Sequence, residues 1–159
     1  MRKTLEVITL AALALLVYAT GRALFGPSHL PDKIPTSFDL TGHPVGWGSP
    51  VMLLLAPAVA IGLYMLITVV ARFPSIFNYP WRVTGENRLR MQALALSMIT
   101  WLKTELICLF AWLQVAAIHA ARNPGERLVA GSAMVPVSIV VVFGTIAWHF
   151  VAMRRAAHA

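Results

Sequence analysis

Four side chains that can ligate a metal share one short segment that is rich in proline and glycine. The segment spans residues 26–50 and contains two imidazoles and two carboxylates, on His29, Asp32, Asp39 and His43. Such a donor set can bind zinc or a related divalent metal. The spacing matches no metal motif, however, and all four residue types are ordinary in polar turns. We therefore predict no metal site, and we expect Asp39 to accept backbone N–H groups in the turn around Thr41-Gly42.

A second polar group lies in an apolar sequence that we expect to cross a membrane. Its members are Lys103, Glu105, Gln114 and His119. Residues eleven apart fall within about 20° on a helix, so Gln92, Lys103 and Gln114 share one stripe. Glu105 and His119, fourteen residues apart, share a different stripe. Lys103 and Glu105 point about 200° apart and should not pair. These stripes could line a crevice for an ion or an apolar ligand. Alternatively, Lys103 and Glu105 mark the inner membrane boundary and His119 the outer one.

The sequence contains no motif that indicates catalysis. A nucleophile elbow, a P-loop, a dinucleotide fingerprint and HExxH are all missing. Ser37, Asp39 and His43 supply the residue types of a catalytic triad, but almost any loop this polar would do so. We predict that the protein is not an enzyme and needs no cofactor.

The composition indicates where such residues would have to be positioned. Of 159 residues, 58% are hydrophobic and 12% are charged, and the mean hydropathy is +0.73. A soluble domain is about 45–50% apolar and about 25% charged. Too little polar surface remains to cover a domain in water, which excludes a soluble enzyme, a disordered regulator and a secreted disulfide scaffold. The fold class that remains is an all-α integral membrane protein, in which the lone Cys108 acts as a small buried hydrophobe.

Four apolar segments are long enough to be transmembrane helices in a single membrane domain covering residues 1–159. They run from about 4–25, 51–71, 92–121 and 129–153, with an outer loop at 26–50 and a cytoplasmic segment at 72–91. The third helix is overlong, because its helical pattern extends from about Gly85 to Ala121. That length corresponds to about 55 Å, against about 30 Å of hydrocarbon. We expect its first part to project from the membrane, with Thr84 as N-cap, and Pro136 to lie in the first turn of the fourth helix.

The cations indicate the orientation and the partners. The formal net charge is +7, and the cations flank apolar segments, which is typical of anchors at lipid headgroups and not of a nucleic-acid interface. More of them lie on the segments that are cytoplasmic if both termini are inside. We therefore predict an N-in, C-in protein in contact with the lipid bilayer, without nucleic acid. Arg82, Arg88 and Arg90 would contact lipid or an acidic partner.

The first apolar segment has an alternative interpretation as a cleaved signal peptide. Met1-Arg2-Lys3 precedes an apolar run of about 14 residues, and cleavage after Ala19 would leave three transmembrane helices. Arg22 directly after the run, and the weak small-residue site, favour a retained helix.

The outer loop carries the most distinctive pattern. It holds five of the ten prolines and four of the ten glycines, which excludes a helix and favours turns with short extended pieces. A strand at 34–40, a turn at 41–44 and a return strand at 45–47 would form a small β-hairpin. Phe38 and Trp47 would then anchor it at the outer membrane interface.

The stretch LPDKIPTSFDLTGHPVGWGSP resembles a bacterial membrane family, the domain of unknown function sixteen-forty-eight of SdpI-type immunity and signalling proteins. The matching positions are Pro31, Ile34, Pro35, Phe38, Gly42, Gly46, Trp47, Gly48 and Ser49. The stretch FNYPWRVTGENRLRMQALALSMITWLKTELI also resembles stand-alone members. Ser37 stands where the family usually has His, and Pro50 where it usually has Lys. The resemblance implies a multi-span protein of the bacterial cytoplasmic membrane, immunity to a toxic peptide and capture of a repressor, but no established chemistry.

These observations give three functional hypotheses. The leading one is a non-enzymatic immunity or signalling protein that binds an extracytoplasmic ligand. Its predicted binding residues are Pro35, Phe38, Asp39, Gly42, His43, Gly46, Trp47 and Gly48. The second is an accessory subunit of a larger membrane complex, with a protein partner in the membrane. The weakest is a small permease with Lys103 and Glu105 on its pathway, because no inverted repeat is evident.

Overall fold

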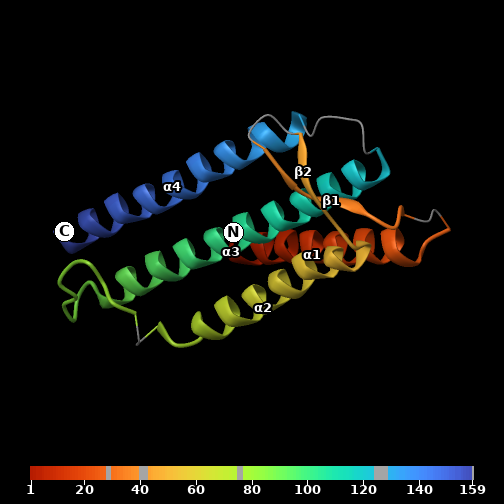
Figure 1. Cartoon of the computed structure of the whole chain (residues 1–159). Coiled ribbons are helices and arrows are strands. Elements are labelled where there is room, and N and C mark those ends of the chain that lie inside the picture. Colours follow the sequence, from red (N-terminus) through yellow and green to blue (C-terminus); the bar gives the residue numbers. More distant parts are fainter. Residues whose placement is uncertain (28–29, 40–42, 75–76, 124–128, 159) are drawn as a thin grey trace.

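The computed structural model of the chain contains four long helices and one β-hairpin (Figure 1). It describes all residues except 28–29, 40–42, 75–76, 124–128 and 159, and it describes only the backbone of residues 129–135. The elements in chain order are α1 (Arg2–Phe25), β1 (Ile34–Phe38), β2 (Pro44–Gly48), the 3-10 helix η1 (Pro50–Leu54), α2 (Leu55–Val70), α3 (Arg88–Arg122) and α4 (Val129–Ala157). The predicted helices and hairpin are thus present.

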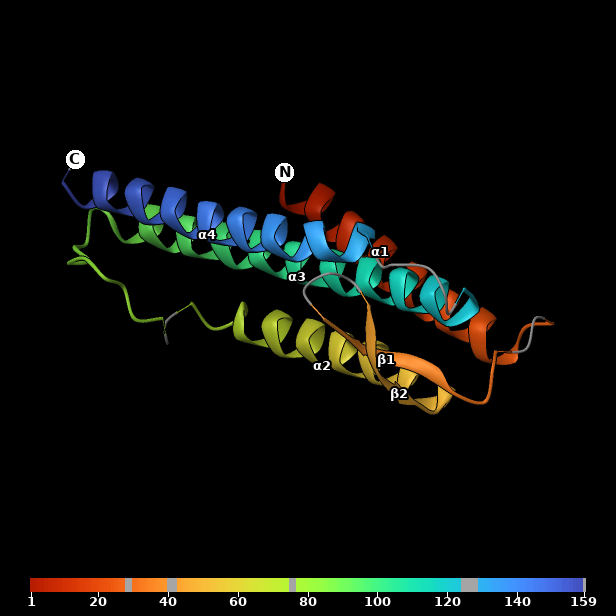
Figure 2. The ribbon, with the colours of Figure 1, turned by 45° about the horizontal axis from the view of Figure 1, so that its top comes forward.

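The central element of the bundle is α3. Helices α1, α2 and α4 all pack against it, and Figures 1 and 2 show it flanked by α2 and α4. The start of α3, the end of α2 and the end of α4 lie at one end of the molecule, which we call the basic end. The hairpin lies toward the other end, which we call the hairpin end.

Two apolar clusters join α1 to α3, one through α2 and the other through η1 and β1. Midway along the bundle, Leu16, Ala60, Ile107 and Ala111 pack together. Nearer the hairpin, β1 contributes Ile34 to a cluster with Ala23, Leu53, Ile118 and Ala121. Small alanines at these contacts let the helix backbones approach closely, as helices in membranes usually do. The hairpin is thus fixed to the helices through its first strand.

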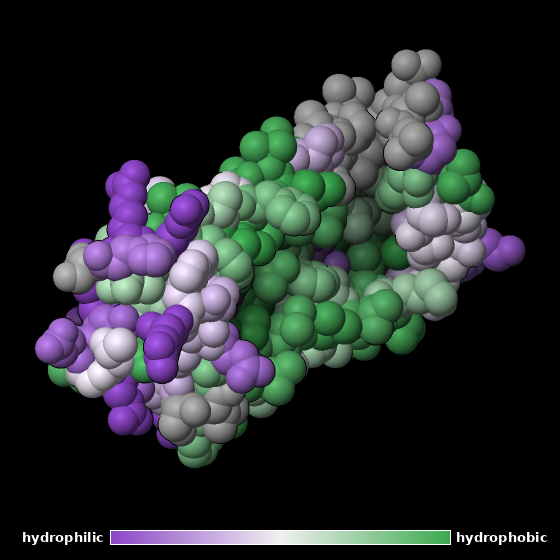
Figure 3. All heavy atoms as spheres, turned by 90° about the vertical axis from the view of Figure 1, so that its left-hand side faces the viewer, coloured by the Kyte–Doolittle hydropathy of each residue, from purple (hydrophilic) through white to green (hydrophobic). Residues whose placement is uncertain are grey.

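Most of the large apolar side chains remain on the outside of the bundle. Val7, Tyr18, Leu66, Val140 and Phe143 are among those exposed by more than half. Figure 3 shows hydrophilic side chains gathered at the basic end and a hydrophobic zone behind them. Within the described residues, four helical segments are long and apolar enough to cross a membrane, Arg2–Phe25, Pro50–Val70, Arg88–Arg122 and Pro136–Ala157. Lipid contact accounts for this exposed apolar surface, so the chain is a multi-pass membrane protein.

The overlong α3 is accompanied by α4 at the basic end. Met91 and Ala95 of α3 pack against Met153 and Ala156 of α4. The segment between α2 and α3 covers this contact with Phe77, Tyr79 and Trp81, and the Trp81 ring meets the edge of Phe150 at 5.6 Å. Because Tyr79 is partly buried here, desolvation raises the pKa of its phenol. The extension of α3 is therefore half of a small helical pair with its own core.

The predicted N-cap of α3 and the predicted place of Pro136 in the first turn of α4 were wrong. Helix α3 begins at Arg88 with Asn87 as its N-cap, not after Thr84. Thr84 and Asn87 instead exchange hydrogen bonds, Thr84 N to Asn87 Oδ1 at 2.8 Å and Asn87 N to Thr84 Oγ1 at 3.4 Å. This reciprocal pair closes a turn before the helix. Helix α4 begins at Val129, so Pro136 lies inside the helix. Membrane helices tolerate such a proline better than soluble ones do.

Candidate functional site

The hairpin pairs its strands antiparallel with a local irregularity. Ile34 lies opposite Gly48, Pro35 opposite Trp47 and Ser37 opposite Gly46, with register shifts on both sides of Ser37. A Cβ on Gly48 would lie 2.6 Å from Met52 Sδ and 2.9 Å from the Thr36 methyl, so this position needs a glycine for close packing. One face of β2 is therefore packed against Thr36 and Met52. Its other face exposes Val45 and Trp47, the latter to 50%.

Asp39 and His43 close the hairpin. The Asp39 N–H donates to the His43 carbonyl at 2.9 Å, and the His43 N–H donates to Asp39 Oδ1 at 2.9 Å. His43 Nδ1 lies 3.7 Å from Asp39 Oδ2. Asp39 therefore accepts a backbone N–H in the turn, as the sequence predicted. Gly42 and His29 lie outside the described residues.

A pocket of about 350 Å³ lies between the hairpin and the helices, and we call it the hairpin pocket. Pro35 and Phe38 line it from β1, Ala56 and Val59 from α2, and Phe110, Gln114 and Ala117 from α3. Its walls are apolar apart from the Gln114 amide and the Thr36 hydroxyl. Such a pocket suits an apolar group with one hydrogen-bonding position. Of the residues predicted to bind a ligand, Pro35 and Phe38 line this pocket, whereas Trp47 faces outward.

Gln114 of α3 lines the hairpin pocket and hydrogen-bonds to two neighbouring elements. Its Nε2 donates to Thr20 Oγ1 at 2.8 Å and to the Leu53 carbonyl at 2.9 Å. Four residues after Leu53 stands Pro57, which has no N–H to donate to that carbonyl. The buried Gln114 side chain supplies a donor in its place, and it ties α3 to both α1 and η1.

Lys103 lies on the same stripe of α3 and also faces α1 and α2. Its Nζ is 2.7 Å from Glu6 Oε2 and 3.3 Å from Thr68 Oγ1, and it sits 4.7 Å from the centre of the Tyr64 ring. The Tyr64 hydroxyl donates to Glu6 Oε1 at 2.7 Å. The predicted stripe of Gln92, Lys103 and Gln114 thus places its last two members toward α1 and α2, both of them buried.

Sequence reasoning missed the partners Glu6, Tyr64 and Thr68. The sequence offered an inner-boundary position for Lys103 as one alternative, but no counter-ion for it. If α1 and α3 had been known to be neighbours, the opposite charges of Glu6 and Lys103 at the same membrane depth would have predicted their ion pair. Periodicity, however, does not say which helices are neighbours.

Glu105 and His119 are not brought together. Glu105 faces α4, where Thr145 Oγ1 donates to its Oε1 at 2.5 Å, and its Oε2 is buried without a hydrogen-bond partner among the described residues. His119 is exposed near the end of α3, within 3.4 Å of Asn123 Nδ2. One turn from Thr145 on α4, His149 contacts Ser97 Oγ of α3 at 3.3 Å. As predicted, Glu105 forms no pair with Lys103, whose charged partner in the described chain is Glu6.

The arginines predicted to meet a partner lie at the basic end. Arg82, Arg88 and Arg90 are exposed, and the Arg82 carbonyl accepts a hydrogen bond from Asn87 Nδ2 at 3.3 Å. Arg82 lies in the segment before α3, and Arg88 and Arg90 lie in its first turn. In the described part of the chain, none of the three lines the hairpin pocket or contacts Lys103 and its partners Glu6, Tyr64 and Thr68.

Comparison with known proteins identifies the segment that carries the hairpin. Residues 7–61 match the family model described as Domain of unknown function (DUF1648). This segment is similar to that domain. It runs from α1 through the hairpin and η1 into α2, and it covers about a third of the chain. The resemblance predicted from the loop motif is thereby confirmed. Searches of the curated proteins and of the solved structures found no match to the chain.

The matched segment supplies most of the hairpin pocket. All of its lining residues on β1, η1 and α2 fall within residues 7–61, and α3 completes the wall from outside the matched segment. Of the motif residues, Ile34, Pro35 and Phe38 line this pocket.

Proposed function

We propose that this chain is a non-enzymatic membrane protein of the immunity or signal-transduction type, which binds an extracytoplasmic ligand at the hairpin. The observation that carries the proposal is the hairpin pocket, whose apolar walls are built by the motif-bearing loop and closed by α3. The ligand would insert an apolar group there, such as a side chain of a membrane-active peptide. The exposed Val45 and Trp47 would add a second apolar contact on the outer face of β2.

The proposal places the hairpin outside the cytoplasm. The excess of cations at the basic end favours that orientation in a bacterial cytoplasmic membrane. Ligand binding against Phe110 and Gln114 would act directly on α3, which also carries Arg88 and Arg90 at its far end. Those cations would then meet an acidic partner surface in the cytoplasm.

A pair of matched substitutions tests the proposal. Ala56→Phe fills the hairpin pocket, whereas Ala58→Phe adds the same ring at an exposed position of α2. Cells that express each variant are challenged with a panel of membrane-active peptides, and survival is compared with that of cells expressing the wild type. We expect the first variant to lose protection and the second to keep it. Equal protection by both would refute binding in this pocket.

The accessory-subunit alternative is distinguished by a separate measurement. The large apolar surface of α4, which packs against α3, leaves room for a neighbouring membrane protein. Native mass spectrometry after extraction from native membranes in mild detergent would show a stoichiometric protein partner if that alternative holds. A monomer or homo-oligomer favours the self-contained immunity or signalling protein.

A further inference from the structure

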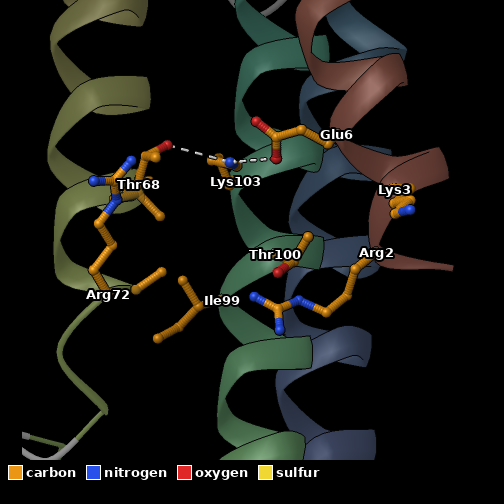
Figure 4. A pocket seen from close by; sticks show the side chains of 10 residues that line it. Arg2, Lys3, Glu6, Thr68, Arg72, Ile99, Thr100 and Lys103 are labelled. Atoms are coloured by element: carbon orange, nitrogen blue, oxygen red, sulfur yellow. Dashed lines mark hydrogen bonds and ion pairs between the residues drawn. The ribbon is translucent and has the colours of Figure 1, made fainter.

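A second cavity lies part-way along the bundle, between the start of α1, the end of α2 and the middle of α3. It measures about 330 Å³, and we call it the basic pocket. Its charged lining consists of Arg2, Lys3 and Glu6 from α1, Arg72 after α2, and Lys103 from α3. Figure 4 shows Arg2 extending toward Thr100 and Arg72 extending toward Thr68. The proposed hairpin ligand does not reach this cavity.

The charges of the basic pocket are unbalanced. Four cationic side chains face one carboxylate, and that carboxylate is already engaged, because Glu6 accepts from both Lys103 and Tyr64. Among the residues that the structure describes, neither Arg2 nor Arg72 forms an ion pair. The cavity therefore carries about three positive charges that the described residues do not neutralise.

The start of α1 adds to this positive potential. Its first turn contains no acidic residue, and no side chain of the described residues caps it. Because the first backbone N–H groups of a helix lack acceptors and the helix dipole is positive there, this end favours an anion. Guanidinium groups suit phosphate in particular, since their paired N–H donors match its oxygens.

The depth of the pocket identifies the source of the anion. α1 and α2 are both long and apolar enough to cross the bilayer, and the pocket lies where one begins and the other ends. Lipid phosphates lie at this boundary, and basic pockets between transmembrane helices bind acidic headgroups. We propose that the basic pocket binds the phosphate group of an anionic lipid headgroup.

Native mass spectrometry with phosphatidylglycerol tests this assignment on the full-length protein. Arg2→Gln/Arg72→Gln removes the two guanidinium groups of the pocket. Each cation near the surface contributes about 1 kcal/mol, so the double variant should bind the lipid about 30-fold more weakly. The matched control Arg154→Gln/Arg155→Gln removes the same charge from exposed positions near the end of α4, and should change affinity less than about twofold.

Further measurements distinguish a lipid site in this pocket from a general charge effect and from a site for a soluble phosphate. Arg2→Lys/Arg72→Lys keeps the charge and should retain more affinity than the glutamine variant, which shows that the pocket itself is intact. Equal weakening by the pocket and control variants, or no weakening by either, would overturn the site. Phosphatidylcholine binding as tightly as phosphatidylglycerol would overturn its preference for an anionic lipid. Binding of glycerol 3-phosphate as tight as that of the lipid would assign the pocket to a soluble phosphate instead.

Discussion

Removing the charge of Glu6 should destabilise the bundle more than removing the charge of Lys103. The two groups are 2.7 Å apart, but their side chains are exposed to different extents, 36% for Glu6 and 7% for Lys103. Glu6→Gln leaves a buried ammonium without its counter-ion, whereas Lys103→Met leaves a carboxylate that can still reach water and still accepts from Tyr64. Breaking a buried pair costs about 3 kcal/mol or more, and an exposed pair is worth at most about 1 kcal/mol.

We therefore expect Glu6→Gln to lower the free energy of unfolding by about 3 kcal/mol and Lys103→Met by about 1 kcal/mol. The double variant has no buried charge at this site and should lie within about 1 kcal/mol of the wild type. Reversible unfolding in mixed micelles of dodecyl maltoside and dodecyl sulfate, followed by tryptophan fluorescence, measures all three. Glu86→Gln and Lys33→Met are the controls, because both residues are exposed. The reasoning is refuted if Glu6→Gln costs no more than Glu86→Gln, or if the two single effects simply add.

Four other predictions concern the remaining contacts. Gln114→Leu removes the donor to the Leu53 carbonyl and should lower the free energy of unfolding by about 2 kcal/mol. Adding Pro57→Ala to that variant should restore part of the loss, because alanine supplies an N–H for the same carbonyl. If the two substitutions instead lower stability additively in the same unfolding assay, this explanation is wrong. Gly48→Ala should destabilise the hairpin by about 1–2 kcal/mol, because both Met52 and Thr36 must move. Gly46→Ala is the control, because it requires only the Ser37 hydroxyl to rotate. Equal melting temperatures of the two variants would argue against this packing. Cleavage after Ala19 would remove Glu6 and Leu16 from their contacts, so we expect residues 1–19 to be retained. Intact mass spectrometry of the membrane-extracted protein measures this, and a mass lower by that of residues 1–19 would show that the segment is a cleaved signal peptide. Single cysteines introduced into a Cys108→Ser variant test the orientation. A cysteine at residue 45 of the hairpin should react with an impermeant maleimide in intact cells, whereas a cysteine at residue 84, before α3, should react only after permeabilisation. The opposite labelling pattern would invert the proposed orientation.

The hairpin and the polar stripe could be predicted from the sequence because both depend on local rules. The prolines and glycines of residues 26–50 exclude a helix and favour turns with short extended pieces, and eleven-residue spacing fixes which side of α3 carries Lys103 and Gln114. The partners of those residues depend on which helices are neighbours, and no periodicity encodes that. Glu6 was therefore not predicted as the counter-ion of Lys103. The basic pocket could not be predicted as a site either, because its cations come from three separate segments.

The start of α3 and the position of Pro136 failed for a different reason. Thr84 has the side chain of an N-cap, but its hydroxyl accepts from the Asn87 N–H in a turn before the helix, which begins only at Arg88. Proline favours the first turn of a helix in water, where a lost hydrogen bond is least costly. That preference is weaker where neighbouring helices can compensate, so it wrongly placed Pro136 in the first turn of α4.

The side-chain bridges between α1 and α3 have a consequence for biosynthesis. Glu6 to Lys103, Thr9 to Thr104 and Thr20 to Gln114 join residues that lie 97, 95 and 94 positions apart. At about 5–20 residues per second, the ribosome completes each partner roughly 5–20 s after the first residue. During that interval Glu6 has no counter-ion from α3, so α1 must wait with its carboxylate at the headgroup level. A nascent chain stalled before residue 103 should therefore hold α1 and α2 in the membrane as separate helices, which α3 draws together when it arrives.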